Sequence, residues 1–252
     1  MTATVRRVLL PLSGIAFAIG VWWLGSEVDD RTPSPATVFD TLVEGLSTSD
    51  GLLLDTRLSV LRVLIGIAIG CTAAVPVGFA LAWFPLIRAM FDPLISFFRA
   101  LPPLALIPLV IVYLGIEETA RISILVYASF FSAVIVIYES VAAIDDVYIR
   151  AGRALGATQF ELFRRVVVPL TVPQIFVAVR VALGVCWATL VAAELVAAQR
   201  GIGSMMRDAQ NFFRQDEVFA GIILIGISAL VMDRIVQLLM SRTVRWQERV
   251  VR

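Results

Sequence analysis

Six long stretches of apolar residues, separated by short polar segments, account for most of the chain. They cover residues 8–24, 60–83, 100–116, 122–144, 172–199 and 219–240. A helix needs about 20 apolar residues to cross a hydrocarbon core of about 30 Å. We therefore predict an all-α polytopic membrane protein with about six transmembrane helices, forming a single transmembrane domain over residues 1–252. Prolines in the third stretch predict a kinked helix rather than a loop, because lipid tolerates no unpaired backbone.

Small residues recur every four positions in the second stretch. They are Gly66, Gly70, Ala74, Gly78 and Ala82. At that spacing they form a continuous stripe on one helix face, which lets another helix backbone approach closely. The stripe favours packing within the chain, with a homodimer interface as the alternative.

Composition supports a membrane protein and excludes several activities. The chain is 59% hydrophobic and 16% charged, whereas soluble domains have about 45–50% apolar and about 25% charged residues. It has no His, which excludes an imidazole general base and an HExxH metal site. It has no Lys, so a nucleotide-binding P-loop is absent. Cys71 and Cys186 lie in apolar runs and are expected to be buried thiols without a metal or disulfide role.

The distribution of arginine predicts the topology. With the N-terminus in the cytoplasm, twelve arginines fall in inside segments and six in outside segments, as the positive-inside rule requires. Both termini are then cytoplasmic, segment 25–58 is extracytoplasmic, and segment 145–169 is a cytoplasmic loop. The first stretch lacks a signal-peptide cleavage site and is interpreted as an uncleaved span.

The loop 145–169 predicts two short helices joined by a glycine. Asp145 is placed to cap the first helix, and Gly156 suits the left-handed residue that closes it. Thr158 and Glu161 have the spacing of a capping box, and Pro169 is expected to end the second helix. Such a hairpin either packs on its own spans at the membrane surface or docks on a partner.

This loop resembles the EAA loop of ABC-importer permeases, in which Glu-Ala-Ala, three residues, Gly, nine residues, Ile, one residue and Leu-Pro follow one another. The loop keeps every spacing of this motif, with Arg150-Ala151-Gly152, Gly156 and Val-x-Val-Pro169 at the corresponding positions. Arg150 replaces the Glu, Gly152 replaces the second Ala, and Val replaces Ile and Leu. The resemblance implies a MetI-like permease fold and a coupling helix that docks on a cytoplasmic ATPase subunit.

Other segments narrow the resemblance to the nitrate, sulfonate and taurine branch. They are residues 92–109, 114–119, 187–195 and 200–203, the last two being most similar to taurine permeases. The resemblance implies import of a small anion, taurine or another aliphatic sulfonate, across a bacterial inner membrane. Nitrate, bicarbonate or a thiamine-precursor-like solute is the alternative.

The resemblance also implies the partners of the chain. They are a second permease copy in a homodimer, cytoplasmic ATP-binding subunits, an extracytoplasmic solute-binding protein and membrane lipid. ATP and Mg would be bound by the partner ATPase, with no cofactor and no metal in this chain. Nothing in the charge pattern suggests nucleic acid.

Charged residues inside spans are the default place to look for a translocation path. Glu194, Arg180 and Glu139 are the candidates. Alternatively, Glu194 pairs with an arginine or caps the Gly201–Gly203 backbone, and Arg180 snorkels or pairs with Glu139. Short amphipathic helices expected after Pro35 and over 203–217 could face the binding protein or rest on lipid headgroups.

Two hypotheses from other functional classes are considered. An ATPase-independent secondary transporter or channel would leave the hairpin without a partner. An intramembrane enzyme lacks a set of catalytic side chains.

Overall fold

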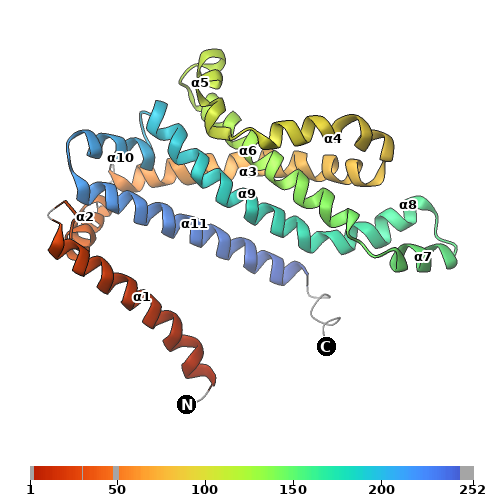
Figure 1. Cartoon of the computed structure of the whole chain (residues 1–252), viewed down its shortest axis with the longest axis horizontal. Coiled ribbons are helices and arrows are strands. Elements are labelled where there is room, and N and C mark those ends of the chain that lie inside the picture. Colours follow the sequence, from red (N-terminus) through yellow and green to blue (C-terminus); the bar gives the residue numbers. More distant parts are fainter. Residues whose placement is uncertain (1–2, 30, 48–50, 245–252) are drawn as a thin grey trace.

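The computed structural model describes residues 3–29, 31–47 and 51–244, and its ordered elements are helices (Figure 1). In chain order they are α1 (Ala3–Val28), α2 (Pro35–Ser47), α3 (Leu52–Trp83), α4 (Pro85–Ala100), α5 (Pro103–Leu114), α6 (Glu118–Ala142), α7 (Asp146–Ala154), α8 (Gln159–Leu162), the π-helical segment η1 (Phe163–Val167), α9 (Val168–Ala197), α10 (Ile202–Asn211) and α11 (Gln215–Thr243). Residues 1–2 and 245–252 lie outside this range, so the predicted cytoplasmic position of the two ends is not described.

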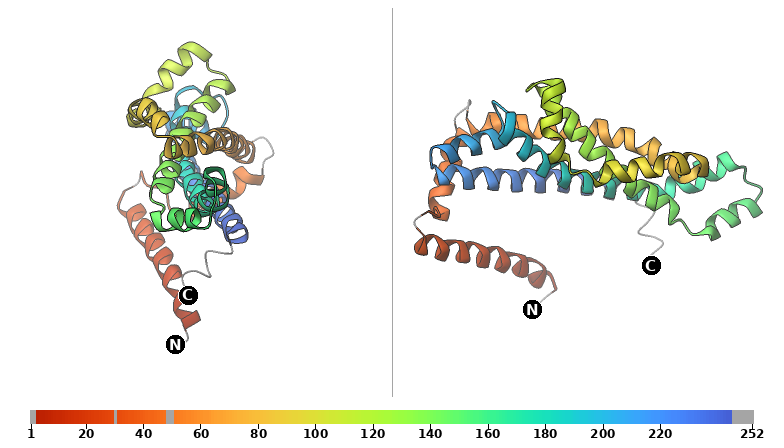
Figure 2. Two further views of the ribbon diagram at one scale, coloured as in Figure 1. Left: turned by 90° about the vertical axis from the view of Figure 1, so that its right-hand side faces the viewer. Right: turned by 45° about the horizontal axis from the view of Figure 1, so that its top comes forward.

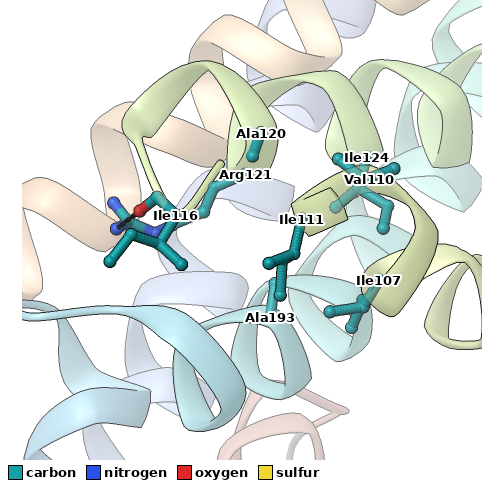
Figure 3. Close-up of a pocket in the computed structure, with 8 residues that line it drawn as sticks. All are labelled: Ile107, Val110, Ile111, Ile116, Ala120, Arg121, Ile124 and Ala193. Atoms are coloured by element: carbon teal, nitrogen blue, oxygen red, sulfur yellow. Dashed lines mark hydrogen bonds between the residues drawn. The ribbon is translucent and has the colours of Figure 1, made fainter. Parts of the chain in front are cut away.

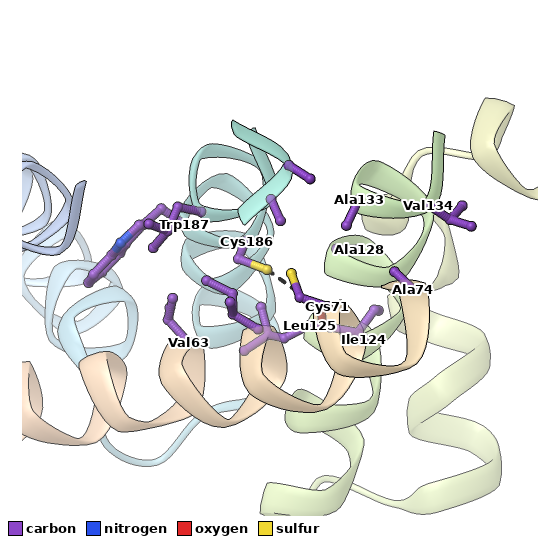
Figure 4. Packing of buried hydrophobic residues seen from close by; sticks show 14 of the residues in the cluster. Val63, Cys71, Ala74, Ile124, Leu125, Ala128, Ala133, Val134, Cys186 and Trp187 are labelled. Atoms are coloured by element: carbon purple, nitrogen blue, oxygen red, sulfur yellow. Dashed lines mark hydrogen bonds between the residues drawn. The ribbon is translucent and has the colours of Figure 1, made fainter. Parts of the chain in front are cut away.

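Helices α3, α6 and α9 form the core of the bundle. The glycines of α3 face α6 so closely that a Cβ on Gly70 would lie 1.9 Å from Ser129 Oγ. Ser129 Oγ also donates to the carbonyl oxygen of Gly66 at 2.9 Å across this interface. The predicted packing of the small-residue stripe within the chain is therefore confirmed. Cys71 of α3 and Cys186 of α9 are buried free thiols that point toward each other in the core (Figure 4).

Within the part of the chain that the structure describes, four helical stretches are long and apolar enough to cross a membrane. They are Leu52–Trp83, Glu118–Ala142, Gln159–Val196 and Gln215–Thr243, and a fifth span results if the bent pair α4–α5 is counted as one. The first predicted span, 8–24, falls on α1, and residues 12–28 of this helix form a further apolar helix. Figure 2 shows α1 standing apart from the bundle, with Trp22 stacked on Phe219 of α11 at 5.7 Å between ring centroids.

The third predicted span, 100–116, is present as the helix α5, but α5 is too short to cross the membrane unless it forms one bent span together with α4. Helices α4 and α5 meet at an angle of 93° around Leu101-Pro102, and α5 has only 12 residues, about 18 Å of helix. Pro102 removes a backbone donor and disfavours a helical conformation at Leu101. The helix α4 is not apparent as an apolar stretch in the sequence, because Arg88, Asp92 and Arg99 interrupt its apolar residues.

The prediction that Pro169 ends the second loop helix is also wrong. Helical structure runs without a break from Gln159 to Val196. Val168 N–H donates to the Phe163 carbonyl five residues earlier, which marks the π-helical segment. Pro169 directly follows this segment, as the second residue of α9, and the π-helical turn before it accommodates the missing N–H within the continuous helix.

Candidate functional site

The first arm of the hairpin is closed at both ends as the sequence predicts. Asp145 Oδ1 accepts from Val147 N–H at 2.8 Å at the start of α7. At its end Gly156 has φ of +81°. Gly156 N–H donates to the Arg153 carbonyl at 2.9 Å, and Ala157 N–H donates to the Gly152 carbonyl at 3.1 Å. These two bonds form a Schellman motif, which needs a left-handed residue at position 156.

The second arm begins with the expected capping box. Thr158 N–H donates to Glu161 Oε2 at 3.0 Å, and Glu161 N–H donates to Thr158 Oγ1 at 3.3 Å. The two arms touch where Gly152 meets Leu162: a Cβ on Gly152 would lie 2.4 Å from Leu162 Cδ2. Glycine in place of the motif's second alanine therefore has a steric reason, because Leu162 occupies the space.

The hairpin projects beyond the end of the bundle (Figures 1 and 2). Arg150 and Ala151 are exposed, as are the apolar side chains of Leu155 (89%) and Phe160 (69%). The second arm is fixed to the bundle, since Phe163 packs edge-on against Phe79 and Trp83 of α3 at 5.5 and 5.3 Å between ring centroids. The hairpin is thus a firmly anchored and largely uncovered surface, continuous with α9.

A buried polar cluster lies at the opposite end of α9. Glu194, which is fully buried, accepts from Arg62 Nη1 at 2.6 Å, from Ser59 Oγ at 2.7 Å and from Gly203 N–H at 2.8 Å. Asp55 accepts from Gly201 N–H at 2.9 Å, and Ser59 Oγ accepts from the next backbone N–H at 3.0 Å. Three successive backbone donors at the start of α10 are therefore satisfied by side chains of α3 and α9.

The cluster extends to the start of α6. Arg62 forms a bidentate pair with Glu118, Nε to Oε2 at 2.7 Å and Nη2 to Oε1 at 2.5 Å. Arg121 Nη1 also donates to Glu118 Oε1 at 2.5 Å. Two arginines and two glutamates thus balance each other. Of these residues, only Glu194 was a candidate from the sequence. Asp55, Ser59 and Glu118 were not, although the polar residues 55, 59 and 62 share one face of an otherwise apolar helix.

The other two candidates for the translocation path lie elsewhere. Arg180 pairs with Asp233 of α11, Nε to Oδ1 at 2.5 Å, rather than with Glu139. Glu139 is exposed on α6. Glu194 makes the contacts of the alternative interpretation, an arginine pair and a cap on Gly203. The three residues are therefore not brought together, and their place on a translocation path stays a prediction.

A small cavity lies where α5 meets α6 and α9 (Figure 3). Apolar side chains such as Ile107, Ile111 and Ile124 line it, with Arg121 at its edge, and its volume is about 10 Å³. Such a volume holds one water molecule at most, so this conformation offers no substrate chamber there. Within the described residues, no three Cys, Asp or Glu side chains gather as a metal-ligand set.

Comparison with known proteins identifies the class. Residues 66–245 match the family of binding-protein-dependent transport system inner membrane components, and the chain belongs to this family. It is a permease subunit of an ABC importer, from the branch that includes taurine, sulfonate and nitrate permeases.

Individual relatives cover nearly the whole chain. A probable ABC transporter permease protein of Brucella abortus is 42% identical over 99% of this chain and 100% of its own length. The taurine transport system permease protein TauC of Escherichia coli is 33% identical over 96% of this chain and 90% of its own. Among solved structures, the inward-facing MetNI methionine ABC transporter aligns with a TM-score of 0.60 at 19% identity, covering 74% of this chain and 94% of that one. The predicted MetI-like permease fold and family are confirmed.

Proposed function

We propose that this chain imports a small anion, taurine or another aliphatic sulfonate, as one copy of a homodimer driven by cytoplasmic ATP-binding subunits. An extracytoplasmic solute-binding protein would deliver the anion to the end of the bundle that carries α2 and α10. The main support for this proposal is the hairpin α7–α8, which is capped and exposed and would offer a rigid docking surface for an ATPase subunit.

The continuity of the hairpin with α9 supports this mechanism. One unbroken helical stretch runs from Gln159 to Val196, which corresponds to roughly 57 Å at 1.5 Å per residue. A displacement of the docked hairpin is therefore carried along α9 to Glu194 and the cluster that holds α10. ATP and Mg would act in the partner subunits, and this chain would convert their closure into a change of access across the membrane.

The end of the bundle opposite the hairpin has a surface that could receive the solute-binding protein. A cleft of about 440 Å³ opens there between α2, α3 and α11, with Thr41, Glu44, Asp55 and Asp216 among its lining residues. Thr41 Oγ1 donates to Asp216 Oδ2 at 2.8 Å and joins α2 to α11. A polar recess of this kind is better suited to contact with a soluble binding protein than to contact with lipid tails. This end would be extracytoplasmic, and the hairpin end cytoplasmic in the bacterial inner membrane.

The anionic substrate rests on the relatives. The taurine, sulfonate and nitrate permeases of the branch are named for small oxyanions or a sulfonate-bearing amino acid. Nitrate, bicarbonate or a thiamine-precursor-like solute is the alternative within the family. An ATPase-independent transporter or channel is the alternative outside it, and it would work without any subunit bound to the hairpin.

Two substitutions at Gly156 test the coupling function. Valine at φ of +81° is strained by about 1–3 kcal/mol, whereas asparagine tolerates the left-handed region. Neither meets a neighbour, because nothing lies within 4 Å of a Cβ at this position. We expect Gly156→Val to abolish ATP-dependent sulfonate uptake in whole cells, Gly156→Asn to retain most of it, and both to reach the membrane. Full uptake by the valine variant would contradict the coupling role.

A further inference from the structure

Helix α4 exposes two different faces. One is apolar and consists of Leu86 (74% exposed), Met90 (61%), Leu94 (51%) and Phe97 (59%). The other, here called the polar stripe, consists of the exposed Arg88, Ser96 and Arg99 and the half-buried Asp92. Both sets follow spacings of four, four and three residues, so each forms one line along the helix. A third face, which includes buried Ile95, packs on the bundle. A helix surrounded only by lipid on its exposed side has no reason for the polar stripe.

The polar stripe runs from the hairpin end of the bundle to the middle of the spans. It begins one turn after α3 ends at Trp83, where the Arg88 guanidinium lies 5.0 Å from the centre of the Tyr138 ring. At its other end Tyr127 OH donates to the Phe98 carbonyl. Tyr127 is the tenth of the 25 residues of α6, so Arg99 lies near mid-depth. Figure 1 shows α4 alongside one half of α3, with α5 turned away.

Arg99 is an exposed charge at a depth where lipid does not solvate it. Placing an arginine at the centre of a span costs free energy, so such residues face protein or a water-filled cavity. Ion pairs with carboxylates are made by Arg62, Arg121 and Arg180. Arg99 makes no ion pair among the residues that the structure describes. The helix also breaks directly after it, at Leu101-Pro102. Irregular backbone at membrane depth persists where protein or a water-filled cavity surrounds it.

The geometry points to a water-lined half-path along the polar stripe, with Arg99 as the residue that holds the transported anion at mid-membrane. The guanidinium fork matches the oxygens of a sulfonate or another small oxyanion. Two arginines against one aspartate make the stripe net positive, which raises the local concentration of anions. The inference rests on the proposed import of an anion and names the site that import would use.

Thiol labelling tests the half-path without any transport assay. Ser96→Cys places a thiol on the polar stripe, and Leu94→Cys places one on the apolar face, both on the same helical turn. The native thiols Cys71 and Cys186 are buried, so the background is low. Inverted membrane vesicles with the full chain are treated with two impermeant methanethiosulfonates, one bearing a sulfonate and one a quaternary ammonium. The thiolate displaces methanesulfinate and forms a mixed disulfide with the reagent.

We expect Ser96→Cys to react and Leu94→Cys to remain unlabelled, because lipid covers the apolar face. The sulfonate reagent should react with Ser96→Cys about tenfold faster than the ammonium reagent, because the positive stripe attracts anions. Adding Arg99→Gln should remove this preference, and adding Arg99→Lys should keep it. Methanesulfonate should slow the labelling only when the charge at position 99 is present.

Equal labelling of the two cysteines, or a preference that survives Arg99→Gln, would overturn the inference. Because no ATPase or binding protein takes part, its failure is separable from that of the proposed function. A chain that imports sulfonates but shows no preferential labelling of Ser96→Cys loses this inference alone. A chain that shows the labelling pattern but imports no anion keeps the anion-attracting stripe and loses the proposed function, together with the transport role of Arg99.

Discussion

Replacing the buried Glu194 by Gln should lower the thermal stability of the protein more than the same replacement at an exposed glutamate. The two carboxylate oxygens of Glu194 accept hydrogen bonds from Arg62, Ser59 and the Gly203 N–H. A glutamine has one acceptor oxygen and one amide that donates, so either orientation sets a donor against Arg62 or against the Gly203 N–H. Arg62 keeps its pair with Glu118, so the cost is that of leaving one buried polar group unsatisfied, about 1–3 kcal/mol. For a chain of this size that corresponds to a Tm lower by roughly 2–12 °C.

The assay is thermal unfolding of the detergent-solubilised chain, followed by tryptophan fluorescence. Glu139→Gln is the matched control, since Glu139 is exposed, and its Tm should stay within a degree or two. If Glu194 instead acted only on the translocation path, Glu194→Gln would lower uptake and leave Tm unchanged. That result would refute the structural role derived from its contacts.

The other predictions concern helix packing and the α9–α11 pair. Gly70→Val should sharply lower the amount of folded protein in membranes, because a Cβ there would lie 1.9 Å from Ser129 Oγ; Gly226→Val, with nothing within 4 Å of its Cβ, should be tolerated. Equal membrane levels of the two variants by immunoblot would contradict the close α3–α6 packing. Arg180→Gln should reduce membrane levels by leaving Asp233 without its cation, and adding Asp233→Asn should restore them. A double variant no better than the single one would argue against the pair.

Local signals in the sequence were sufficient for the hairpin and for most spans. The caps at Asp145 and Thr158 and the turn at Gly156 each depend on residues within a few positions, so their geometry follows from the residue types. The glycine stripe likewise predicts where α3 packs. These features combine strong local preferences with simple helical periodicity.

The contacts between distant segments could not be predicted from the sequence. The cluster around Glu194 joins α3, α6, α9 and the start of α10, and spacing along the chain carries no information on which of these segments meet. Arg180 pairs with Asp233, 53 positions away, rather than with Glu139. Pro169 was expected to break a helix, but the π-helical turn before it accommodates the missing N–H.

The central claim, that the hairpin couples this permease to an ATPase, is tested most directly by cross-linking from its tip. A photoreactive amino acid at Leu155, which is 89% exposed, is compared with one at Val112 of α5, which is 79% exposed. Both variants are expressed in the native cell together with the other genes of the transport system. Illumination should join the ATP-binding subunit to position 155 and not to position 112. Absence of that product at position 155, in cells that still import the solute, would contradict the account.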